Sequence, residues 1–274
     1  ALAEYFGAIE GASLEANKGA YSYAWMIIFA VIAAIMVLIG LYHIRMLPSN
    51  QIPSTTKKTT SEVGRELVAV IANFFTKKHI FYYICFIILY RLAEGFIMKI
   101  APLFLRASRE VGGLGLSLKE IGTLNGVFGS AAFVLGSLLA GIYVSKFGLK
   151  RTLFTLCCIF NLPFLAYTFL AVTQPTNVYL IGTCITMEYF GYGFGFVGLT
   201  LFMMQQIAPG KHQMSHYAFA SGIMNLGVML PGMVSGYFSD LLGYRNFFIY
   251  VLIATIPAFL ITYFIPFTYD DSKK

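Results

Sequence analysis

The amino-acid sequence predicts an all-α membrane protein with seven transmembrane helices, and two features carry this prediction. Of its 274 residues, 58% are hydrophobic and only 11% are charged, whereas soluble globular domains carry about 25% charged residues. Seven separate stretches are also long and apolar enough to cross a bilayer, which needs about 20 such residues per helix. These features argue against a disordered chain, a collagen, a secreted disulfide scaffold and an ordinary cytosolic enzyme.

The predicted spans follow one another along most of the chain. A capping-box pattern, Ser117–Glu120, stands directly before the third span. The residues 174–177 form a short uncharged turn after the fourth, and Pro209-Gly210 ends the fifth. The spans are predicted at residues 23–42, 80–105, 118–145, 152–173, 178–207, 217–239 and 246–266.

The longest connection, residues 43–79, separates the first span from the other six. Within it, residues 61–79 alternate charged and apolar side chains at helical spacing, which predicts an amphipathic helix on the membrane surface. A solvated linker is the alternative. The predicted organisation is an outer segment with one helix (1–47), a cytoplasmic linker with the amphipathic helix (48–79) and a six-helix bundle (80–274). The apolar positions of the amphipathic helix are Val63, Leu67, Val70, Ile71 and Phe74.

The net charge of +7 is not interpreted as a nucleic-acid signal, because in a membrane protein the distribution of basic residues between the two sides matters more than the total. We expect no nucleic-acid partner. Twelve of the nineteen Lys and Arg residues fall on the side of the 43–79 loop, five fall on the other side, and Arg91 and Lys99 lie inside spans. Because Lys and Arg accumulate in cytoplasmic loops, this loop and the C-terminus are predicted to be cytoplasmic. The N-terminus of the chain is then outside.

Four ionisable side chains interrupt the spans. Arg91 and Glu94 stand three residues apart in the second span, on one face of the predicted helix, where they can form an ion pair. Lys99 in the same span and Glu188 in the fifth meet if their helices face one cavity. Such groups are costly in a bilayer. They either neutralise charge between helices or contact a substrate, a proton or a gate.

Amide side chains and glycines also occur within the predicted spans. Asn125 and Asn225, like Asn161, Gln205 and Gln206, form interhelical hydrogen bonds or contact a polar substrate. The fifth span holds a run of alternating glycines from Gly191 to Gly198 that includes Tyr192. This run predicts close helix packing, with helix bending during transport as an addition.

The sequence predicts no enzyme, metal site or cofactor. The four cysteines lie in apolar stretches, and His212 and His216 are expected in a short interfacial loop. A seven-helix receptor is an alternative class. It is disfavoured because the last span has no ionisable residue except tyrosine and the long connection divides the spans as one plus six.

One loop carries a family signature. Residues 141–151, Gly-Ile-Tyr-Val-Ser-Lys-Phe-Gly-Leu-Lys-Arg, resemble the loop Gly-x-x-x-Asp-Arg/Lys-x-Gly-Arg/Lys-Arg/Lys of the major facilitator superfamily. Ser145 stands where an acidic residue is typical. The resemblance implies a gating role for Gly141, Lys146, Gly148, Lys150 and Arg151.

Three segments resemble a narrower group, the muropeptide permease (AmpG) type with its acetyl-CoA transporter relatives. They are residues 90–96, 188–195 and 235–248. The resemblance implies helices six to twelve of a twelve-helix proton symporter in a bacterial inner membrane, with helices seven and ten lining the cavity. Its implied cargo is an anhydro-muropeptide for peptidoglycan recycling, and its implied partners are lipid, protons and an N-terminal half. Acetyl-CoA or another small anionic or sugar solute is the alternative cargo. The resemblance implies that Arg91, Glu94 and Glu188 couple substrate or proton. Four further residues in the spans are candidates for the same role: Lys99, Asn125, Tyr192 and Asn225.

Overall fold

The computed structural model describes residues 2–7, 9, 13, 15–46 and 59–269. These residues are predominantly helical and contain no strand. They divide into two compact units, Ala1–Thr59 and Thr60–Lys274. Most of the predicted linker, residues 47–58, lies outside the described part of the chain.

The first unit contains α1 (Leu2–Tyr5) and the 29-residue α2 (Lys18–Met46). The side chain of Asn17 fixes the segment before α2, because its Oδ1 accepts a hydrogen bond from the Ile9 N–H at 2.9 Å and its Nδ2 donates to the Ile9 carbonyl at 2.8 Å. Helix α2 exposes apolar side chains around its circumference, among them Trp25 and Phe29. It contains the predicted first span and extends beyond both of its ends.

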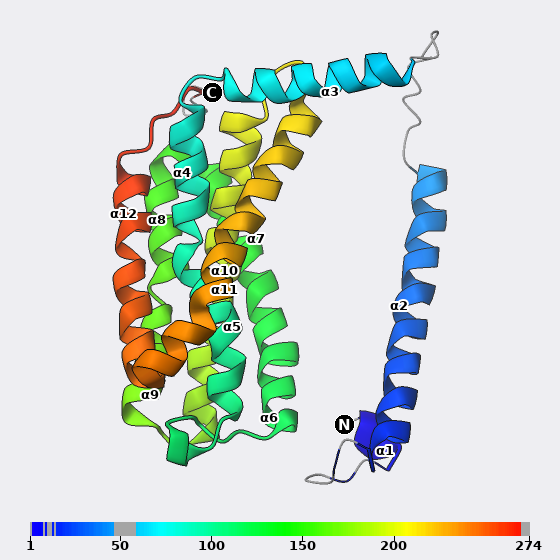
Figure 1. Cartoon of the computed structure of the whole chain (residues 1–274), viewed down its shortest axis with the longest axis vertical. Helices are drawn as coiled ribbons and strands as arrows, with labels where there is room; N and C mark the ends of the chain where they lie inside the picture. The colour runs from blue at the N-terminus through cyan, green and yellow to red at the C-terminus, as the bar shows by residue number, and fades with distance from the viewer. Residues whose placement is uncertain (1, 8, 10–12, 14, 47–58, 270–274) are drawn as a thin grey trace. The chain divides into compact units, whose positions relative to one another are not determined.

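The second unit is a helical bundle with α3 lying across one end (Figure 1). Helix α10 packs against α7 and α8, and α11 packs against α5. Its elements are α3 (Thr60–Phe75), α4 (Ile80–Tyr90), α5 (Leu92–Arg106), η1 (Arg109–Val111), α6 (Leu118–Thr123), η2 (Leu124–Gly129), α7 (Ser130–Phe147), α8 (Leu149–Asn161), α9 (Phe164–Thr173), α10 (Val178–Phe202), η3 (Met203–Ile207), α11 (Gln213–Ala254) and α12 (Ile256–Tyr263).

The predicted spans are confirmed as helices. Among the described residues, five helical segments are apolar enough to cross a membrane by length and composition. The last of them, Gln213–Tyr263, is interrupted at Gly243, whose φ of 69° and ψ of 160° divide it into two spans. Helix α10, with 25 residues and Glu188 as its one charged side chain, is also long enough. The other four of the five apolar segments are Lys18–Met46, Ile80–Arg106, Leu118–Phe147 and Leu149–Thr173.

Several spans are interrupted within the bundle. Helices α4 and α5 meet at Arg91, whose φ of −104° and ψ of 6° lie outside the helical region. Helices α8 and α9 meet at Pro163, which cannot donate a backbone hydrogen bond. Two segments, η2 and η3, have π-helical hydrogen bonding, a feature frequent at functional sites.

The predicted amphipathic helix corresponds to α3, which runs from Thr60 to Phe75. It ends at Phe75, before the predicted residue 79, and residues 76–79 form a turn in which His79 adopts a left-handed backbone conformation, with φ 60°. Val70 and Phe74 are buried, and the Phe74 ring centroid lies 5.7 Å from those of His216 and Phe219 on α11. The membrane-surface location stays a prediction.

The glycine run of α10 gives close helix packing, as predicted. A Cβ at Gly193 would overlap the backbone carbonyl of Phe133 on α7, and one at Gly195 would overlap the side chain of Phe160 on α8. Glycine therefore lets α10 approach both neighbours at backbone distance. A role for the run in bending stays a prediction.

Gly193→Ala is expected to destabilise the bundle by about 1–3 kcal/mol, as overpacking does when the neighbour is backbone and cannot rotate away. The measurement is the midpoint of thermal unfolding in detergent. Gly222→Ala on α11 is the control, since a Cβ there would meet nothing within 4 Å. An unfolding midpoint for Gly193→Ala at or above that of Gly222→Ala would contradict the packing argument.

Candidate functional site

The predicted ion pair forms at the break between α4 and α5. Arg91 Nε donates to Glu94 Oε2 at 2.6 Å, and Arg91 Nη2 donates to Glu94 Oε1. The guanidinium also lies over the ring of Phe196 on α10, 5.4 Å from its centroid. Both charged side chains are buried. The pair thus neutralises Glu94 with the two-point geometry that Arg and carboxylate favour.

A cavity of about 120 Å³ brings four predicted site residues together. Glu94 enters it from α5, Asn125 from η2, and Glu188 and Tyr192 from α10. Two carboxylates, an amide and phenol groups therefore converge on one space inside the bundle. The remaining lining residues are Ile97, Met98, Ala101, Pro102, Leu105, Tyr167 and Tyr189.

Two of these groups have unused hydrogen-bonding capacity. Asn125 Oδ1 is buried and has no hydrogen-bond partner among the described residues. The structure records no hydrogen bond or ion pair for the Glu188 carboxyl within the described ranges, and Arg91 is held by Glu94. A buried acceptor without a partner is costly. The cavity is therefore suited to a proton and to the donors of a polar ligand.

Two other predicted residues lie elsewhere. Lys99 is exposed, packs beside Gly232 of α11 and does not line the cavity. Five residues separate it from Glu94, which rotates it by about 140° around the helix. The structure does not bring it to Glu188. Asn225 is exposed on α11 and is likewise not among the lining residues.

The loop between α7 and α8 is a tight turn at Gly148, whose φ of 78° favours glycine. Its N–H donates to the Val144 carbonyl at 2.8 Å, which ends α7. Ser145 Oγ donates to the Ile142 carbonyl at 2.9 Å. Of the predicted loop residues, Gly141, Lys146, Gly148 and Arg151 line a second cavity; Lys150 is exposed outside this lining.

A family profile described as Major Facilitator Superfamily matches residues 2–208. The chain belongs to the Major Facilitator Superfamily. The match includes α2, the broken helix with Arg91 and Glu94, and the loop at Gly148.

The chain is similar in sequence to several curated bacterial proteins. It is 23% identical over 209 residues to the anhydromuropeptide permease of Escherichia coli (strain K12), covering 76% of this chain and 41% of the relative. It is 25% identical over 238 residues to transporter AmpG 1 of Rickettsia bellii, covering 85% and 56%. It is 27% identical over 204 residues to transporter AmpG 2 of Rickettsia prowazekii, covering 73% and 47%. The chain thus spans about half the length of these relatives.

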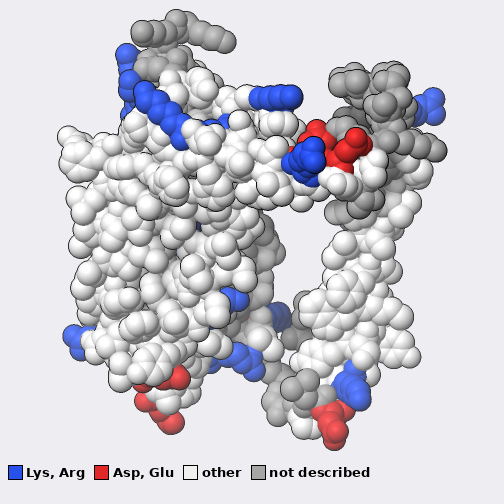
Figure 2. Space-filling view, turned by 45° about the horizontal axis from the view of Figure 1, so that its top comes forward, with Lys and Arg blue, Asp and Glu red and all other residues white. Residues whose placement is uncertain are grey.

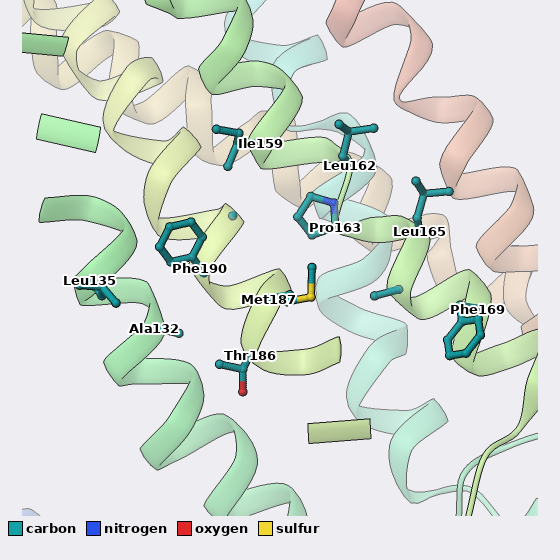
Figure 3. Close-up of a pocket in the computed structure, with 12 residues that line it drawn as sticks. Ala132, Leu135, Ile159, Leu162, Pro163, Leu165, Phe169, Thr186, Met187 and Phe190 are labelled. Atoms are coloured by element: carbon teal, nitrogen blue, oxygen red, sulfur yellow. The ribbon is translucent and has the colours of Figure 1, made fainter. Parts of the chain in front are cut away.

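A third, apolar cavity of about 740 Å³, larger than the acidic one, lies between α7, α8, α9 and α10 (Figure 3). Its lining includes Leu135, Leu165, Phe169 and Phe190. The hydroxyl of Thr186, the one polar side chain that lines it, is bonded to the Gly182 carbonyl at 2.7 Å. This space therefore offers little to a polar solute, in spite of its size.

Charged side chains gather at the ends of the bundle. Figure 2 shows a broad uncharged band over the face in view, with lysines and arginines mainly at the two ends. This distribution fits a multi-pass membrane protein, because charged groups avoid the hydrocarbon core. The superfamily assignment and the apolar helices support the same conclusion.

The end of the bundle under α3 is held by polar contacts. Lys77 Nζ donates to the carbonyls of Ile207 at 2.5 Å and Pro209 at 2.6 Å, which ties the α3–α4 turn to the end of η3. Burial lowers the pKa of Lys77 below its ordinary value. Gln206, one of the amides singled out in the sequence, accepts from the N–H groups of Thr268 and Tyr269 at 2.8 and 3.0 Å.

Some site residues were missed and one expectation was wrong. Tyr167 and Tyr189 line the acidic cavity but were not predicted; Tyr189 directly follows Glu188 in sequence, which could have indicated it, whereas Tyr167 carries no such signal. His216 does not lie in an interfacial loop: α11 begins at Gln213, and His216 is buried against α3. Its Nε2 lies 3.4 Å from the Val70 carbonyl. Packing of α3 onto the bundle covers it.

Proposed function

We propose that the chain is part of a proton-coupled secondary transporter that imports anhydromuropeptides for cell-wall recycling. The observation that carries the proposal is the cavity in which Glu94, Glu188, Asn125 and Tyr192 converge. Ionisable groups at membrane depth are expensive and mark substrate and proton pathways. Among relatives at 23–27% identity, one is named an anhydromuropeptide permease.

The carboxyl of Glu188 is proposed to carry the coupled proton. Glu94 already has a cationic partner, because Arg91 holds it in a two-point ion pair. Glu188 is half-buried and has no such partner in the described part of the chain, so we propose that its carboxyl takes up and releases the coupled proton. In this proposal the Arg91–Glu94 pair stays in place as a fixed charge pair while Glu188 exchanges the coupled proton.

The cavity favours a hydroxyl-rich cargo over an anionic one. Its carboxyl, amide and phenol groups can accept hydrogen bonds from sugar hydroxyls and amides. Acetyl-CoA, the alternative, carries several phosphate charges. Arg91 is held by Glu94 and Lys99 lies elsewhere, so the described residues of the cavity lining offer no free cation to balance a phosphate.

The complete transporter is proposed to include an N-terminal half that supplies the other wall of the transport path. The coverage of 41–56% of the relatives' lengths supports this proposal. We place the protein in the bacterial inner membrane, with the α3 end of the bundle in the cytoplasm, from the excess of Lys and Arg there.

The test is uptake of labelled anhydromuropeptide by vesicles that contain the full-length protein. Accumulation driven by an imposed pH gradient and abolished by an uncoupler is expected. Labelled acetyl-CoA is the second arm. Accumulation of acetyl-CoA alone would replace the proposed cargo, and uptake indifferent to the uncoupler would overturn proton coupling.

Asn125→Ala is expected to raise the KM for muropeptide uptake about tenfold, because it removes one uncharged hydrogen bond to the cargo. Asn225→Ala is the matched control: the same residue type, also in a transmembrane helix, but outside the cavity lining. The measurement is initial uptake rate against substrate concentration. An equal change in both variants would remove Asn125 from cargo recognition.

A further inference from the structure

The cavity at the α7–α8 loop has a mixed character that the proposed transport step does not use. Its volume is about 700 Å³, and it lies between the end of α7, the start of α8 and the last turns of α10 and η3. It is separate from the acidic cavity, because the two share no lining residue. Its lining residues are Gly141, Val144, Ser145, Lys146, Phe147, Gly148, Arg151, Val197, Leu201 and Gln205.

The charged lining of this cavity is entirely basic. Lys146 and Arg151 contribute two positive charges, both side chains are exposed, and no carboxylate lines the space. Arg151 lies in the first turn of the 13-residue helix α8, whose positive dipole end adds to the same potential. Gln205 adds an amide group from η3.

Most of the remaining lining is apolar and continues onto the side of the bundle. Val197 and Leu201 form one wall on α10, while Phe147 and the neighbouring Ile142 are exposed on α7. The cavity therefore lies where charged helix ends meet the apolar lateral surface. A ligand that fits both parts has an anionic head and a hydrocarbon tail.

We propose that this cavity binds an anionic phospholipid, with its phosphate between Lys146 and Arg151 and an acyl chain along Val197 and Leu201. Basic pockets between transmembrane helices bind anionic headgroups in this way. A soluble phosphate would satisfy the two cations but would leave the apolar wall unused. The inference is independent of which solute the transporter carries.

The experiment is native mass spectrometry of the full-length protein in detergent, titrated with phosphatidylglycerol or with phosphatidylcholine of identical acyl chains. Phosphatidylglycerol is expected to bind at least tenfold more tightly. Lys146→Ala and Arg151→Ala should each weaken it about fivefold, as each basic group near a lipid surface does. Ser145→Asp, which introduces a negative charge into the lining, should weaken it further.

Lys78→Ala is the matched control, since Lys78 is an exposed lysine that does not line the cavity. Equal binding of the two lipids, or equal losses for Lys78→Ala and Lys146→Ala, would overturn the proposal. Glycerol phosphate is the third arm: competition with phosphatidylglycerol at similar concentration would assign the cavity to a soluble anion instead. Because no arm requires transport, failure here is distinguishable from failure of the proposed function.

Discussion

Glu188→Gln is expected to abolish accumulation of the cargo against a gradient, so that the ratio of internal to external solute falls to about one. Glutamine has the shape of a protonated glutamic acid but cannot release the proton. Without that release, proton and solute binding are no longer linked, and the gradient cannot drive uptake. Exchange of labelled for unlabelled solute across the membrane should persist, since it requires no net proton movement.

The measurement is therefore paired: accumulation driven by a pH gradient, and counterflow exchange with no gradient. Glu110→Gln is the control. This substitution removes the same charge, but Glu110 is exposed in η1 at the end of the bundle. Normal accumulation by Glu188→Gln would exclude Glu188 as the proton carrier. If Glu188→Gln lost both accumulation and exchange, Glu188 would be assigned to cargo binding instead.

The midpoint of thermal unfolding distinguishes a loss of transport function from damage to the structure. Glu188 makes no hydrogen bond or ion pair in the described part of the chain, so its replacement by an isosteric amide breaks no recorded contact. The variant should therefore unfold at the temperature of the unchanged protein. This independence makes Glu188 a sharper target than Glu94, which is bound to Arg91.

The positions of the spans were predictable because long apolar stretches have few alternatives in a bilayer. The Arg91–Glu94 pair was also predictable, since a separation of three residues places two side chains on one helix face. The same geometry applied to Lys99 shows why it does not join them. Five residues rotate the side chain toward α11, where it packs beside Gly232.

The composition of the acidic cavity was not predictable as a set. Asn125 and Asn225 are both amides in apolar helices, yet only Asn125 reaches the cavity. It lies in the π-helical segment η2, and no residue pattern in the sequence indicates that segment. Which helices are neighbours also depends on packing between residues far apart in the chain.

The buried pair predicts the largest effect on stability. Arg91→Met is expected to lower the free energy of unfolding by about 3–5 kcal/mol, because it leaves the Glu94 carboxylate buried without its cation. Glu94→Met should cost a similar amount by leaving the guanidinium unpaired. Arg109→Met is the control. Arg109 also makes two hydrogen bonds, to the carbonyls of Gln174 and Pro175 at 2.9 Å each, but it is exposed.

The double variant Arg91→Met/Glu94→Met should regain most of the lost stability, since replacing both charges removes the unpaired group. Unfolding of all four proteins gives the interaction energy as a double-mutant cycle. Additive losses would show that the two side chains do not stabilise each other. Transport by the double variant then separates the two roles considered for these charges. A pair that only neutralises charge between helices predicts normal uptake, whereas the proposed fixed charge beside Glu188 predicts a stable protein that accumulates no cargo.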